Sequence, residues 1–136
     1  MFFYILYYKF ENILPADRWE FFWGDNMKKV AIIRCRQTEE VCGSTMDFKI
    51  AAEGKGSFEQ FGPCEVVGVV SCGGCPGKLA IGRAKMLIRH GAEVIAFASC
   101  ITKGTPFGFP CPNRELMLET VKKTVGEKAI VLDYTH

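Results

Sequence analysis

The sequence contains no hydrophobic run long enough to cross a membrane. Its most apolar stretch, residues 2–8, is about seven residues long and is followed by Lys9 and Glu11, whereas a membrane-spanning helix needs ~20 residues. No segment combines a charged start, an apolar centre and a small-residue cleavage site, as a secretion signal does. We therefore predict a cytoplasmic protein with no membrane partner.

Neither sign of charge dominates the sequence. The chain has 17 Lys and Arg against 15 Asp and Glu, and no basic tract interleaved with aromatic residues. A nucleic-acid partner is therefore not expected. The 136 residues, 49% of them hydrophobic, are enough for one domain with its own core and too few for two ordinary domains.

Several common catalytic motifs are also missing. A phosphotyrosine phosphatase needs Arg six positions after its cysteine, but Lys78 follows Cys72 and Ile81 follows Cys75 at that spacing. The P-loop motif, which binds phosphate, is absent as well. Cys72 occupies the position of its first glycine, and Leu79 occupies the position of its Ser or Thr. There is no Ser-His-Asp order and no HExxH helix. His90, before a glycine, is expected to be an ordinary surface residue.

Cysteine, in contrast, is abundant. The chain has seven cysteines, which is high for its length, but the number is odd and no secretion signal accompanies them. A disulfide framework of the kind found in small secreted proteins is therefore not expected. Reduced cysteines used for metal or redox chemistry fit the composition better.

Residues 1–26 differ from the rest of the chain in being rich in aromatic residues. Met27 begins a typical first strand, so we predict that residues 1–26 are an extension upstream of the natural start, and that residues 27–136 form the domain. An additional edge strand or an interfacial aromatic anchor are the alternatives.

After Met27 the chain alternates short, continuously apolar runs with helical patterns. The apolar runs are residues 30–33, 66–70, 94–98 and 129–132, and helices are predicted over 45–54, over 76–90 and from Asn113 to about residue 125. Continuous hydrophobicity is typical of parallel strands buried on both faces. The predicted fold is α/β: a small, open parallel sheet of about four strands with helices on both faces, similar to Rossmann and flavodoxin folds.

The second apolar run ends in the sequence Cys72-Gly-Gly-Cys75-Pro-Gly. Proline is favoured in the first turn of a helix, so Pro76 predicts a helix start that places Cys75 at or beside the cap. The positive end of a helix dipole would stabilise both thiolates. Gly73 and Gly74 would let the turn fold back so that both sulfurs face one point.

The other cysteines also follow strands. Parallel strands deliver their carboxyl ends to one edge of the sheet, where ligands bind in open α/β folds. The residues expected near this edge are Cys35, Cys42, Cys72, Cys75, Cys100, Cys111 and His136, with the loop 100–112 as a cover. Only Cys64 precedes its strand, and we interpret it as structural.

A group of thiolates with one imidazole selects a soft metal. Zinc, held by about four ligands at roughly 2.3 Å from sulfur, is the first choice, and an iron–sulfur cluster is the alternative. A second hypothesis is a thiol/disulfide oxidoreductase in which Cys72 and Cys75 cycle between dithiol and disulfide. A third, an organic ligand such as a flavin phosphate, ranks last because no cysteine-free glycine loop could hold a phosphate.

Residues 27–136 resemble the CGGC-domain family of small prokaryotic proteins. The resemblance is carried in order by residues 32–35, Val41-Cys42, residues 53–56, 72–75, 98–101 and 108–112, and Thr135-His136. It implies metal binding, with zinc suggested by the cysteines and histidines, and no established reaction. It also implies the seven ligand candidates named above. One departure is Asn113, where relatives often have histidine after Cys-Pro.

Overall fold

The computed structural model describes residues 27–136, and the predictions for residues 1–26 lie outside the described residues. Four strands form one sheet: β1 (Lys28–Arg34), β2 (Cys64–Ser71), β3 (Val94–Phe97) and β4 (Ile130–Leu132). Their order is β2-β1-β3-β4, and every pair is parallel. The predicted α/β fold with a four-stranded parallel sheet is confirmed.

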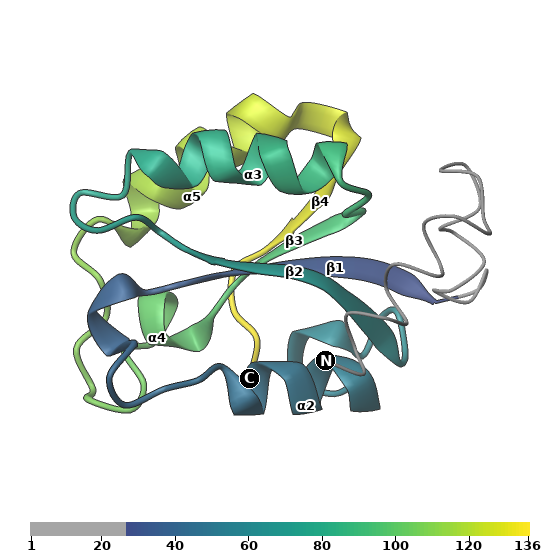
Figure 1. Cartoon of the computed structure of the whole chain (residues 1–136), viewed down its shortest axis with the longest axis horizontal. Coiled ribbons are helices and arrows are strands. Elements are labelled where there is room, and N and C mark those ends of the chain that lie inside the picture. Colours follow the sequence, from purple (N-terminus) through teal and green to yellow (C-terminus); the bar gives the residue numbers. More distant parts are fainter. Residues whose placement is uncertain (1–26) are drawn as a thin grey trace, which may run out of the picture.

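Helices cover both faces of this sheet. Figure 1 shows α3 (Leu79–Arg89) and α5 (Arg114–Val125) on one face, and α2 (Thr45–Glu53) and the short α4 (Ser99–Thr102) on the other. Three 3-10 turns complete the elements, at Arg36–Thr38, Gly56–Phe58 and Gly126–Lys128. Among residues 27–136, no helix is both long enough and apolar enough to cross a bilayer.

The core lies along the two central strands. Residues 30–33 of β1 and all of β3 are fully buried, as their continuous hydrophobicity predicts. β2 differs, because every residue after Cys64 is only half-buried. The expectation that its apolar run is buried on both faces is therefore wrong. The reason is its position, since β2 is an edge strand with β1 as its single neighbour.

The prediction that the third helical segment starts at Pro76 is also wrong, because α3 begins at Leu79. Pro76 and Gly77 belong to a turn in which the N–H of Gly77 donates to the carbonyl of Gly74 at 2.8 Å. Gly77 has φ +90°, and a Cβ there would lie 2.7 Å from Cε of Met117 on α5. The turn thus packs against α5, and neither cysteine stands at the N-cap of α3, which is Lys78.

The other helix boundaries follow the sequence signals more closely. The helix predicted over 45–54 is α2, which ends at Glu53 and is followed by Gly54 as a left-handed cap with φ +67°. α5 lies between Asn113 and Gly126 as predicted, although the Asn113 side chain makes no capping hydrogen bond. The predicted loop 100–112 contains the end of α4, which the sequence did not indicate.

Candidate functional site

A cavity of about 460 Å³ lies at the carboxyl end of the sheet. Figure 1 shows that the segments following β1, β2 and α4 gather at this end of the molecule. Four of the cysteines line the cavity, each from a different segment: Cys35 directly after β1, Cys75 in the turn after β2, Cys100 in α4, and Cys111 in the loop before α5. The strand order places these four thiols around one space.

Cys35 and Cys100 are in direct contact because β1 and β3 are neighbours in the sheet. The backbone N–H of Cys35 donates to Sγ of Cys100 at 3.3 Å. Burial raises the pKa of the Cys100 thiol, and the nearby charges of Cys35 and Asp47 raise it further. The Cys35 N–H and the Thr38 hydroxyl act in the opposite direction without cancelling the effect of burial. Cys100 is therefore a neutral thiol near pH 7 when no metal is bound.

Cys35 interacts with three other cysteines. Burial is the main cause that raises its pKa, and repulsion from Cys72 and Cys111 adds to it. The N–H groups of the following 3-10 turn favour the Cys35 thiolate and partly offset these effects. Cys35 thus couples electrostatically to Cys72, Cys100 and Cys111, which come from three other segments of the chain.

The two cysteines of the CGGC turn differ in exposure. Cys72 is buried and its N–H donates to the carbonyl of Arg34 at 2.8 Å, which continues the β1–β2 pairing past the end of the strand. It does not line the cavity. Cys75 is exposed and does line it. The turn therefore presents one thiol to the cavity and holds the other beside Cys35.

Two further candidates, Cys42 and His136, lie away from the cavity lining. Sγ of Cys42 accepts a hydrogen bond from the N–H of Ser44 at 3.4 Å. His136 turns toward α2, where its Nε2 is 3.7 Å from Oδ1 of Asp47. Its backbone N–H donates to the Ser99 hydroxyl at 3.0 Å.

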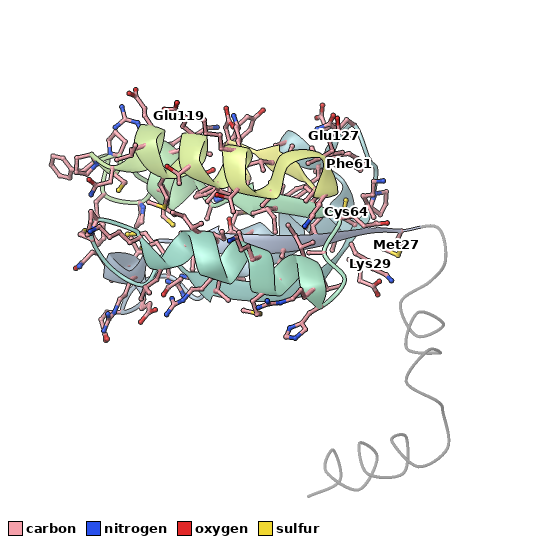
Figure 2. The ribbon with its side chains drawn as sticks, turned by 90° about the horizontal axis from the view of Figure 1, so that it is seen from above. Met27, Lys29, Phe61, Cys64, Glu119 and Glu127 are labelled. Atoms are coloured by element: carbon pink, nitrogen blue, oxygen red, sulfur yellow. The ribbon has the colours of Figure 1, made fainter. Side chains whose placement is uncertain are left out.

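Cys64 lies at the opposite edge of the sheet, as the sequence predicts. Figure 2 shows it beside Met27 and Lys29, where β1 and β2 begin. It is 2% exposed, and its thiol donates to the carbonyl of Gly62 at 3.1 Å. Burial raises the pKa of this thiol despite the positive charge of Lys28. These features fit a structural residue.

A buried polar network that no sequence pattern indicated joins α2 to the last residues of the chain. The Asp47 carboxylate on α2 is 3% exposed and accepts a hydrogen bond from the Thr135 hydroxyl at 2.5 Å. The Thr135 hydroxyl oxygen also accepts a hydrogen bond from the N–H of Ser99, at the start of α4, at 3.2 Å. This network ties the residues after β4 to α2 and α4. An acidic residue in the first turn of a helix is common, so Asp47 carried no distinctive signal.

One wall of the cavity is the loop between α4 and α5. The N–H of Gly104 donates to the Ser99 carbonyl at 2.9 Å, and the N–H of Cys111 donates to the Ile101 carbonyl at 2.8 Å. These bonds fold the loop back on α4, and it carries two exposed aromatic side chains, Phe107 and Phe109, that line the cavity. The sequence predicts a loop that covers this edge, but not the contribution of its aromatic residues.

The donor atoms suit a soft metal, since thiols predominate around the cavity. Their spacing does not match a closed metal site: within residues 27–136, no three Cys, His, Asp or Glu side chains are close enough together to hold one ion. The cysteines share a space without forming a tetrahedral set. A bound metal would therefore require the thiols to approach one another.

Two proteins of Methanocaldococcus jannaschii are similar to this chain. Uncharacterized protein MJ0766 is 42% identical over 64 residues, which cover 46% of this chain and 91% of that protein. Uncharacterized protein MJ0582 is 40% identical over 80 residues, 53% of this chain and 61% of that protein. No solved structure matches the chain. Residues 29–136 match the family described as CGGC domain, and the chain therefore belongs to the CGGC-domain family.

Proposed function

We propose that this protein binds a soft metal through cysteine thiolates in the cavity at the carboxyl end of its sheet. The observation that carries the proposal is that four thiols from four separate segments line one cavity. Membership of a cysteine-rich family associated with metal binding supports it. The ligands are Cys35, Cys75, Cys100 and Cys111.

Zinc is the proposed metal, because four thiolates are a common ligand set for zinc, which has no redox chemistry of its own. An iron–sulfur cluster is the alternative, and the size of the cavity favours it, since 460 Å³ is far more than one ion occupies. Cys72, Cys42 and His136 would be ligands only if the segments that carry them moved. A metal would require the four cavity thiols to approach one another, and Cys75 is the exposed member of the four.

Metal analysis of the full chain, purified anaerobically without added metal, tests this proposal. We expect close to one equivalent of zinc and no visible colour, or iron with the broad visible absorption of a cluster. Cys35→Ala and Cys100→Ala should each lose the metal, because both thiols belong to the packed part of the site. Cys64→Ala is the matched control and should keep it. A folded protein with reduced thiols that takes up no metal would overturn the proposal.

The same preparation distinguishes metal binding from redox catalysis by Cys72 and Cys75. The N-cap of α3 is Lys78, so neither Cys72 nor Cys75 occupies the cap position at which reactive cysteines are commonly found. A reversible dithiol/disulfide couple, present in the metal-free protein and abolished by Cys72→Ser, would favour the oxidoreductase instead.

A further inference from the structure

The cavity has an apolar wall that metal binding does not require. Beyond its four cysteines, its lining includes Phe107, Phe109, Pro110 and Pro112. These side chains stand on the loop between α4 and α5, opposite the strand ends. A site that bound only a metal ion would need the sulfur ligands and the neighbouring residues that orient them. It would not need an aromatic wall.

The size and charge of the cavity match those of a small-molecule site. Pockets for organic ligands are typically about 300–1,000 Å³ and mostly apolar, with a few polar groups that orient the ligand. This cavity has a volume of about 460 Å³ and none of its lining residues carries a carboxylate, ammonium or guanidinium group. The side chains of Gln37 and Thr105 supply polar atoms at its wall. An anionic ligand would find no positively charged side chain there.

The loop that forms this wall is held in place by its own backbone. Gly104 has φ +81°, and a Cβ there would lie 2.3 Å from the backbone of Phe109 and Pro110. The N–H of Gly108 donates back to the carbonyl of Gly104 at 2.6 Å. The two phenylalanine rings are 57% and 82% exposed, so they leave a large apolar surface uncovered at the mouth of the cavity. A buried ligand would cover it.

We infer that the cavity binds an uncharged, largely apolar organic molecule with a planar or aromatic face, which stacks against Phe107 and Phe109 above the thiols. This goes beyond metal binding, because the aromatic wall is present without a metal. The polar atoms of Gln37 and Thr105 would accept or donate one or two hydrogen bonds to the ligand.

A pair of fluorescent probes of similar shape tests the inference. N-phenyl-1-naphthylamine is uncharged, and 1-anilinonaphthalene-8-sulfonate adds a negative charge to the same aromatic frame. Titrated into the full chain with reduced thiols, the uncharged probe should bind saturably with about one site per chain, and about tenfold more tightly than the sulfonate. Both titrations are made on metal-free and zinc-loaded protein, with the metal content measured on each sample.

Two variants then test whether the probe binds in the cavity. Phe109→Ala should weaken binding of the uncharged probe about fivefold or more, because an aromatic stacking partner is lost. Leu116→Ala is the matched control: Leu116 is 69% exposed on α5 and does not line the cavity, so binding should be unchanged. Both positions are too exposed for the change to unfold the protein.

The outcomes separate this inference from the proposed function. Absence of saturable binding, tighter binding of the sulfonate, or equal effects of the two variants would overturn the inference even in protein that holds a metal. Binding of the uncharged probe to a protein that takes up no metal would support it and refute only the metal proposal.

Discussion

Replacement of Gly104 by alanine tests whether the close approach of the loop 104–110 to itself shapes the cavity. Gly104 combines a left-handed backbone, φ +81°, with contact distances that no Cβ can occupy: 2.3 Å to the carbonyl carbon of Phe109 and 2.3 Å to the nitrogen of Pro110. Both contacts are with backbone atoms, so no side-chain rotation can relieve them.

The expected cost has two parts. An L-residue in the left-handed region costs about 1–2 kcal/mol relative to glycine. The overlap with the backbone adds about 1–3 kcal/mol, the usual cost of forcing extra atoms into a filled space. Gly104→Ala should therefore lower the free energy of unfolding by about 2–5 kcal/mol. At about 4 °C per kcal/mol, the melting temperature should fall by about 8–20 °C.

Gly108→Ala is the matched control for this change. Gly108 lies in the same loop with a similar φ of +77°, but a Cβ there would have no atom within 4 Å. It should incur only the backbone cost of about 1–2 kcal/mol. Urea denaturation of both variants gives the difference. If the loop moves apart to relieve the overlap, Gly104→Ala should lose less stability than the sum of the two parts above, but it should clearly lose binding of the uncharged probe. Equal stability and equal probe binding in the two variants would refute the reasoning.

Four further predictions concern the thiols and the polar network. Thr135→Val removes the hydroxyl that donates to the buried Asp47 carboxylate, so urea denaturation should show a loss of about 1.5–3 kcal/mol; no loss would mean that the carboxylate has another partner. In the metal-free protein iodoacetamide should modify the exposed Cys75 well before Cys100, as peptide mass analysis would reveal, because burial keeps Cys100 protonated. The pKa of Cys100 is raised above its ordinary value near 9.0, so the folded state holds its proton to higher pH than the unfolded state, and stability should fall as the pH rises above about 9; a stability that rises over this range would contradict the assignment. Cys64→Ala should cost about 1 kcal/mol of stability by leaving a small void, and a change in metal content would contradict its structural role.

The strands and the general position of the site could be predicted from the sequence because they follow from short-range patterns. The continuous apolar runs indicated β1 and β3 correctly, and the strand-end cysteines Cys35 and Cys100 lie at one cavity. Parallel pairing makes this inference safe, since every strand ends at the same edge.

The features that were missed depend on contacts between distant parts of the chain. The start of α3 is shifted from Pro76 because the turn packs against Met117, which no local helix rule includes. The path of His136, after the last strand, follows its contacts with the buried Asp47 on α2 and with Ser99 on α4. In both cases a local signal was present, and a partner far along the chain determined the outcome.

The contact between the Cys35 N–H and the Cys100 sulfur joins positions 65 residues apart, so the site has no local precursor. A peptide with the CGGC turn alone would hold one of the four cavity thiols, Cys75, and lack the other three. Occupancy of the cavity would then require the separate segments that carry these thiols to be in place, and a bound ligand would stabilise the whole domain by an amount that grows with the logarithm of its affinity.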